Sequence, residues 1–168
     1  MKSELTVDHL VERIVTDAAD LQAEIESNRL DLDRVGTQGR TPLMVAAAEG
    51  FAPAVGILLA HGASVRAAGR GRMTALHEAS ANGHLEIARR LLADGADVDA
   101  ETIDGVTPLM CAAAWGHDQV ATLLLQGRAD AKKTDRTGAT AAEIAHEKGH
   151  DLTADLIDGF PARPAGPD

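Results

Sequence analysis

The side chains best suited to metal binding in this sequence are its histidines, and two of the seven stand four residues apart. His146 and His150 have a spacing that can place two ligands on one face of a helix. Gly149 lies between them, and glycine favours the end of a helix. The chain has one cysteine and no His-Glu-x-x-His motif, so the ligand clusters typical of zinc sites are missing from the sequence. We expect no metal site.

Cys111 is a candidate nucleophile because a histidine lies nearby in the sequence. It stands in the run CAAA, however, where small residues predict a buried and unreactive thiol. The run GRGR at 69–72 has neither the preceding strand nor the Lys-Ser/Thr pair of a phosphate-binding loop. We therefore expect no enzymatic activity and no cofactor. An activity that uses His146, His150 or Cys111 with a small molecule or metal is the competing hypothesis.

The elements that position these side chains follow a repeat of 33 residues. Each of four copies carries a threonine and, nine residues later, a glycine; the threonines are Thr41, Thr74, Thr107 and Thr140. The threonine stands where a helix N-cap is needed, and the glycine ends a short helix. A second, leucine-rich helix follows. Because one unit cannot bury its own apolar face, we expect the units to stack.

Several motif residues recur in phase: Thr41-Pro42-Leu43, Thr74-Ala75-Leu76-His77, Thr107-Pro108-Leu109, Gly83–Ile87 and Leu91–Val98. They resemble the ankyrin-repeat family, whose period is the one found here. The resemblance implies an all-α solenoid of stacked helix–turn–helix units joined by β-type turns. The expected domains are a degenerate N-terminal capping repeat at 1–35, ankyrin repeats at 36–68, 69–101 and 102–134, a C-terminal capping repeat at 135–159 and a disordered tail at 160–168.

Two arginines stand where the other repeats have glycine. Arg72 replaces the glycine of the turn that precedes the first helix, and Arg128 replaces the glycine that ends the second helix. We expect a local distortion of the chain at these places, or a positive φ at Arg128, because the matching glycines adopt such a conformation at little cost.

The resemblance implies that partners bind along the turn tips and the exposed side of the first helices, which line one concave face. Matching positions predict these protein-binding residues: Gln38, Arg40, Glu49, Arg70, Arg72, Met73, Asn82, Ile103, Asp104, Val106 and Trp115. Trp115 is the foremost candidate, because its counterparts Glu49, Asn82 and Lys148 are polar. A large ring at such a position is typical of a binding hot spot. The alternative is that the ring packs over a neighbouring helical turn.

Charge is unevenly distributed along the chain. Residues 36–72 hold four bases and one acid, net +3, whereas 1–35 and 73–105 are each net −5. Arg40, Arg66, Arg70 and Arg72 are predicted to form a basic group near the first full turn. A partner with an acidic spot facing this group and an apolar spot facing Trp115 is complementary to it. Solvated arginines that only aid solubility are the alternative.

The formal net charge of the 168-residue chain is −10, which argues against nucleic acid and anionic membranes as partners. No signal-peptide pattern and no apolar run of membrane-spanning length are found. We expect a cytoplasmic, non-catalytic protein, monomeric in isolation, that binds a protein partner as an adaptor or inhibitor. A self-associating assembly module and a toxin-neutralising partner of one enzyme are the alternatives.

Overall fold

The computed structural model describes residues 18–28 and 30–161. The helices in these residues are α2 (Ala18–Asn28), α3 (Pro42–Ala48), α4 (Ala52–Ala60), α5 (Ala75–Ala81), α6 (Leu85–Ala93), α7 (Pro108–Ala114), α8 (Asp118–Gln126), α9 (Ala141–Glu147) and α10 (Asp151–Gly159), with a short 3-10 helix η1 at Arg70–Arg72. Half of the predicted N-terminal capping repeat and most of the predicted tail lie outside the described residues.

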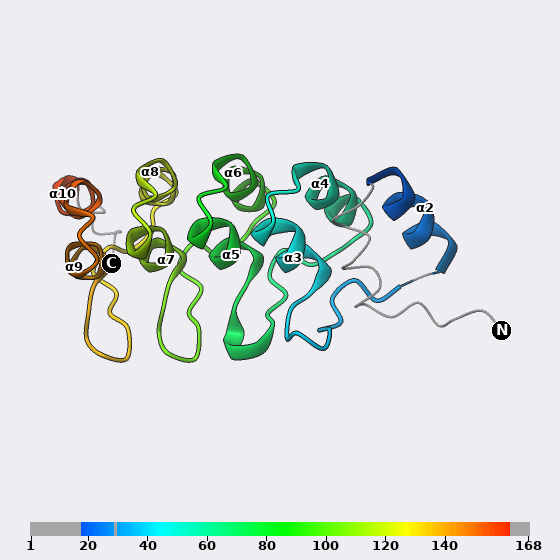
Figure 1. Cartoon of the computed structure of the whole chain (residues 1–168), viewed down its shortest axis with the longest axis horizontal. Coiled ribbons are helices and arrows are strands. Elements are labelled where there is room, and N and C mark those ends of the chain that lie inside the picture. Colours follow the sequence, from blue (N-terminus) through cyan, green and yellow to red (C-terminus); the bar gives the residue numbers. More distant parts are fainter. Residues whose placement is uncertain (1–17, 29, 162–168) are drawn as a thin grey trace, which may run out of the picture.

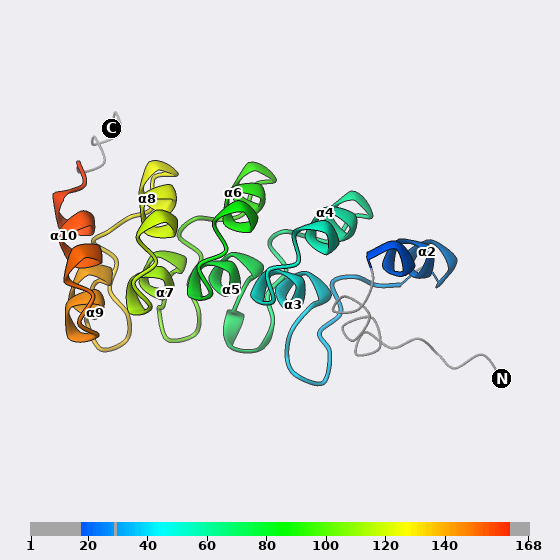
Figure 2. The same cartoon turned by 45° about the horizontal axis from the view of Figure 1, so that its top comes forward.

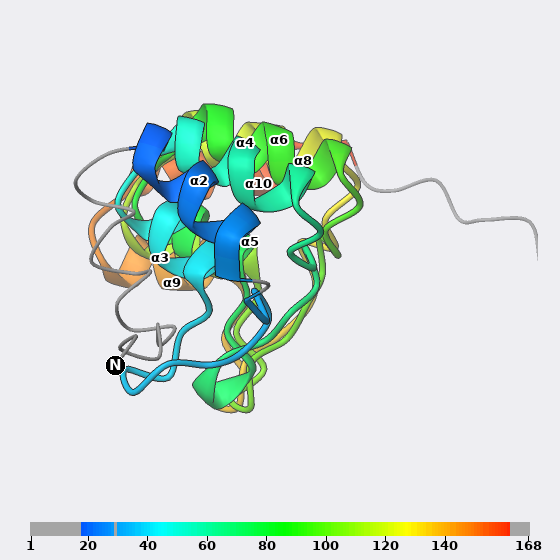
Figure 3. The same ribbon diagram turned by 90° about the vertical axis from the view of Figure 1, so that its right-hand side faces the viewer.

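The helices form two rows along the length of the molecule (Figure 1). The inner row is α3, α5, α7 and α9, which contact one another in chain order, and the outer row is α2, α4, α6, α8 and α10. Figure 2 shows the same two rows from another side. In the view along the array, the loops that precede the inner helices lie together on one side of the helices (Figure 3). The predicted all-α solenoid is confirmed.

The loop before each inner helix is a hairpin, as the predicted β-type turns require. A backbone hydrogen bond closes each one at the same place in the repeat: Gly36 N to Arg40 O, Gly69 N to Met73 O, Thr102 N to Val106 O and Asp135 N to Ala139 O. Isolated β-bridges join Ala68 with Thr74 and Thr134 with Thr140. In the described part of the chain these bridges do not extend into a sheet, so the hairpins stay narrow.

The inner helices begin where the threonines predict. The Thr41 hydroxyl oxygen accepts a hydrogen bond from the Met44 amide at 3.3 Å, and Thr107 does the same for Met110. Each threonine thereby satisfies one amide that the first helical turn leaves unpaired. The middle of each helix carries a fully buried alanine: Ala46, Ala79, Ala112 and Ala145. These small side chains allow neighbouring inner helices to approach closely.

The glycines after α3, α5 and α7 are required for two reasons, as Gly83 shows. Gly83 has a φ of 72°, which disfavours any side chain with a Cβ. A Cβ there would also lie 2.7 Å from the ring of His117, which belongs to the next repeat. That ring donates a hydrogen bond from Nε2 to the Ala81 carbonyl oxygen at 3.1 Å. The glycine therefore makes room for a histidine of the next repeat, and His84 and His117 each bond to a backbone carbonyl of the repeat before them.

Both arginines that replace glycines adopt the left-handed backbone conformation. The φ of Arg72 is 63° and that of Arg128 is 70°. The positive φ predicted at Arg128 is confirmed. The local distortion appears in the second hairpin, where η1 contains Gly71 at a φ of 70°. The repeat geometry therefore imposes the conformation on these two positions although arginine disfavours it.

Candidate functional site

The candidate site is the surface formed by the hairpins and the exposed side of the inner helices, which we call the inner face. Four matching positions in successive repeats build it. The hairpin tips contribute Thr37, Arg70, Ile103 and Arg136. The positions before the threonines contribute Arg40, Met73, Val106 and Ala139. The fourth positions after the threonines contribute Val45, Glu78, Cys111 and Ile144. The C-cap residues of the inner helices are Glu49, Asn82, Trp115 and Lys148.

One repeat presents apolar side chains at all four of these positions. Ile103 is 61% exposed and Trp115 is 66% exposed, and Val106 and Cys111 between them are half-buried. We call these four residues the apolar column. Each of the remaining three repeats has charged residues among its four matching positions. The exposure of Trp115 agrees with its predicted place on the surface, and it argues against packing of the ring over a neighbouring helical turn.

The hairpins are tied to one another by backbone hydrogen bonds. Arg70 N donates to Gly39 O at 2.7 Å, and Ile103 N donates to Gly71 O at 2.9 Å. Arg136 N donates to Asp104 O at 2.8 Å. These bonds fix the spacing of the tips before any partner arrives, so binding on this face requires little further ordering of the backbone.

An ion pair with a nearly buried carboxylate joins the first two repeats on the inner face. Arg40 Nε lies 2.9 Å from Glu78 Oε1, and their side chains are 41% and 7% exposed. Burial raises the pKa of Glu78 above its ordinary value, and the positive charge of Arg40 partly opposes this rise in pKa. The negative charge of the Glu78 carboxylate is therefore balanced by the positive charge of Arg40.

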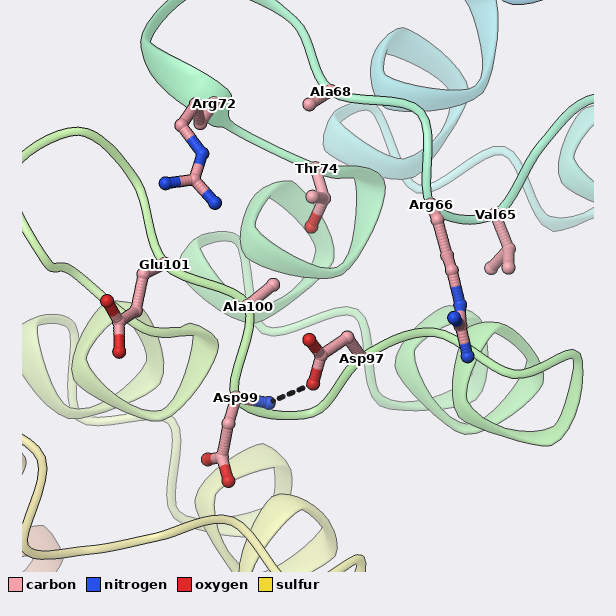
Figure 4. A pocket seen from close by; sticks show the side chains of 9 residues that line it. All are labelled: Val65, Arg66, Ala68, Arg72, Thr74, Asp97, Asp99, Ala100 and Glu101. Carbon is pink, nitrogen blue, oxygen red and sulfur yellow. Dashed lines mark hydrogen bonds between the residues drawn. The ribbon is translucent and has the colours of Figure 1, made fainter.

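The four arginines of the predicted basic group have different surroundings: Arg40 pairs with Glu78, whereas Arg66 and Arg72 line a pocket. Both line a pocket of about 310 Å³ together with acidic residues at the end of the second ankyrin repeat (Figure 4). Those acids are Asp97, Asp99 and Glu101. Arg66 also donates from Nε to the Gly95 carbonyl oxygen at 3.0 Å. Arg72 stands in η1 with Arg70, and its side chain lines this pocket, whereas the Arg40 guanidinium contacts Glu78.

The other predicted binding residues are accessible to different degrees. Gln38, Glu49 and Asn82 are exposed, whereas Met73 is half-buried. Asp104 is also exposed, and its Oδ1 lies 2.8 Å from Nη1 of Arg136.

The sequence-based prediction missed one residue of the inner face, Glu78. The signal for Glu78 is present in the sequence, because its counterparts Val45, Cys111 and Ile144 are apolar. A charge in an otherwise apolar row needs a partner, and the repeat alignment does not say which one.

The histidines that follow the repeat have structural roles. His77 Nδ1 accepts from the Thr74 amide at 3.2 Å, and Nε2 donates to the Val106 carbonyl oxygen at 3.1 Å. The ring of His77 therefore joins the start of α5 to the hairpin of the next repeat. Burial lowers the pKa of this ring. His146 instead pairs with Asp151 at 2.8 Å on the surface. Within residues 18–28 and 30–161, no group of three or more potential metal ligands is found.

The prediction of an unreactive thiol at Cys111 is supported by the desolvation of that thiol, although the residue as a whole is not fully buried. The residue is half-buried, because its position on α7 faces the inner face, as does that of its counterpart Ile144. Desolvation and the nearby Glu78 carboxylate raise the pKa of the Cys111 thiol to about 12. The thiolate that nucleophilic chemistry needs is therefore scarce at neutral pH.

Comparison with known families agrees with this architecture. The family model described as ankyrin repeats (3 copies) matches residues 6–102, and the model described as ankyrin repeat matches residues 104–136. The chain belongs to the ankyrin-repeat family. Ankyrin repeats are generally protein–protein interaction modules, and the family is typically non-catalytic. A search of curated proteins found no match. Among the described residues of this ankyrin-repeat chain, none of the helices has the length and apolar character needed to cross a membrane.

Proposed function

We propose that this ankyrin-repeat chain binds a protein partner through its inner face, with Trp115 as the central apolar anchor. The observation that carries the proposal is the 66% exposure of Trp115 at a position where the other repeats place Glu49, Asn82 and Lys148. Exposed tryptophan leaves a large apolar surface in water, and its burial against a partner is favourable. Ile103, at the tip of the same column, adds a second exposed apolar group.

The chain acts in this proposal as a non-catalytic adaptor or inhibitor, monomeric in isolation and cytoplasmic. The hydrogen-bonded hairpins and the stacked inner helices support the proposal, because a preformed surface loses little conformational entropy on binding. Inhibition of one specific enzyme, such as a toxin, is compatible with the same surface. The partner's identity decides between these roles.

The test is affinity capture from the source lysate with the wild-type chain and the variant Trp115→Ala. Leu152→Ala is the matched control, because Leu152 is 77% exposed on α10, away from the inner face. A partner identified by mass spectrometry is then measured by calorimetry. Loss of a hot-spot tryptophan costs about 2 kcal/mol or more, which weakens binding about thirtyfold. Equal binding by the wild type and Trp115→Ala, or equal losses with both variants, refutes the proposal.

Sedimentation of the free chain over a wide range of concentrations tests its oligomeric state. A mass that stays at 17.5 kDa supports a monomer. A mass that rises with concentration supports the self-associating alternative, and Trp115→Ala then shows whether the inner face mediates the association.

A further inference from the structure

We propose that Arg40, held in place by the nearly buried Glu78, is a receptor for a carboxylate group of the protein partner. This inference rests on the proposed function, because it assigns the chemistry of one part of the same inner face. Arg40 is the receptor in this assignment, and Glu78 is a positioning residue.

Glu78 stands in a place where a charge is unexpected. Its counterparts in the other repeats are apolar, namely Val45, Cys111 and Ile144. Its side chain is only 7% exposed, so a partner has little access to the carboxylate itself. The side chain of Arg40 covers it and remains 41% exposed. The accessible member of the pair is therefore the arginine.

The guanidinium group of Arg40 has binding capacity beyond this contact. It carries five N–H donors in a planar fork, and one carboxylate accepts from two of them in the bidentate arrangement. In the ion pair with Glu78, the contact is made by Nε of Arg40. A long side chain that is anchored at this edge has lost much of its rotamer freedom already, so a second carboxylate binds to it at a smaller entropic cost.

A second arginine lies beside the same hairpin. Arg70 donates from its backbone amide to Gly39 O, directly before Arg40 in the chain. Its Cβ and Nε lie 2.8 and 3.4 Å from where a Cβ on Gly39 would be, so the side chain runs along this residue. Arg70 is exposed and forms no ion pair within the described residues. Two guanidinium groups, one anchored and one unpaired, thus flank the first hairpin.

The charge distribution favours an acidic group at this place. The whole chain has a net charge of −10, which repels a partner's carboxylate over most of the surface. The segment 36–72 differs, with four bases and one acid. A partner segment that carries one carboxylate and, one or two repeats away, an apolar side chain for the apolar column therefore matches both features of the inner face.

The ion pair is expected to contribute little net stability. A role in recognition can therefore be distinguished from a purely structural role. Replacing a buried ion pair by apolar residues of similar size is often neutral or stabilising, whereas removal of one member is costly. The chain itself provides apolar replacements, because Met73 is the counterpart of Arg40 and Ile144 is that of Glu78. The variant Arg40→Met/Glu78→Ile is therefore expected to fold, with a melting temperature no more than about 3 °C below wild type.

The experiment selects binders from a phage-displayed library of random dodecapeptides on the immobilised full chain. The wild type is expected to enrich peptides that combine Asp or Glu with an aromatic or aliphatic residue. We expect Arg40→Met/Glu78→Ile to lower the acidic enrichment at least fivefold and to leave the apolar enrichment unchanged. Trp115→Ala is expected to show the reverse pattern.

The outcomes distinguish the two proposals. Enriched peptides without an acidic preference, or with one that persists in Arg40→Met/Glu78→Ile, overturn the carboxylate receptor and leave the proposed function standing. A fall in the melting temperature of that variant by 10 °C or more also overturns it, because the pair is then structural. Failure to enrich any peptide, or peptides indifferent to Trp115→Ala, counts against both proposals.

Discussion

Arg128 is the clearest place to test how the repeat geometry overrides local preference. Its φ is 70°, and its counterparts Gly62 and Gly95 have φ values of 91° and 90°. Nothing lies within 4 Å of a Cβ built on either glycine, so the position is open and contributes no packing. Arg128 is itself exposed. The variant Arg128→Gly therefore changes the backbone preference and little else.

The expected gain follows from two opposing contributions to the free energy of unfolding. A side chain with a Cβ costs roughly 1–2 kcal/mol in the left-handed conformation. Glycine in turn lowers the free energy of unfolding by roughly 0.5–1 kcal/mol, because it loses more backbone entropy on folding. The midpoints of these ranges leave a stabilisation of about 0.75 kcal/mol. For a chain of this size, that raises the melting temperature by about 1–4 °C.

Urea denaturation followed by circular dichroism measures this gain. Arg128→Ala is the matched control, because it removes the long side chain and keeps the Cβ, so it should leave the stability within about 0.3 kcal/mol of wild type. Gly95→Ala is the converse change and should destabilise the chain by about 1 kcal/mol. If Arg128→Gly is no more stable than Arg128→Ala, the side chain rather than the backbone conformation controls stability here, and the reasoning is refuted.

Three further predictions concern buried or half-buried polar groups. Burial lowers the pKa of His77 in the folded state, so the wild type loses stability as the pH falls below 6.5. The variant His77→Met, which has the residue found at the matching positions Met44 and Met110, should reduce this loss. Urea denaturation at several pH values measures the difference. Ser80→Ala should raise the free energy of unfolding by about 1 kcal/mol in urea denaturation, because the buried Ser80 hydroxyl has no hydrogen-bond partner among the described residues. Cys111 should react with iodoacetamide at pH 8 at least about tenfold more slowly in the folded chain than in urea, because its pKa is raised to about 12.

Each of these three predictions has an outcome that contradicts it. Parallel pH profiles for the wild type and His77→Met show that the ring is not the acid-sensitive group. A loss of stability in Ser80→Ala shows that the hydroxyl is satisfied in solution. Equal alkylation rates in the folded and unfolded chain show that the thiol of Cys111 is not protected.

The two-row architecture could be predicted from the sequence because its causes are local and periodic. Thr41 and Thr107 cap helices through bonds that reach only three residues along the chain. Gly83 and its counterparts end the helices by a backbone preference of a single residue. The repetition of these signals every 33 residues then determines the stacking, since each copy meets the same neighbour. The positive φ at Arg128 could be predicted for the same reason.

The composition of the inner face was only partly predictable. The exposed position of Trp115 follows from the phase of the repeat, because Glu49, Asn82 and Lys148 occupy the same place. The phase of the repeat does not determine which residues of a neighbouring repeat a long side chain contacts. Arg72 lines a pocket together with Asp99 and Glu101, whereas Arg40 pairs with Glu78 of the next repeat.

The sequence alone therefore determined the repeat, the caps, the turns and the row on which each residue stands, because these depend on backbone preferences and on a fixed period. The tertiary structure alone decided the pairing of Arg40 with Glu78, the pocket that Arg66 and Arg72 line, and the half-buried state of Cys111. These features depend on distances between side chains of neighbouring repeats, which lie about 30 residues apart in the chain and meet only when the helices stack.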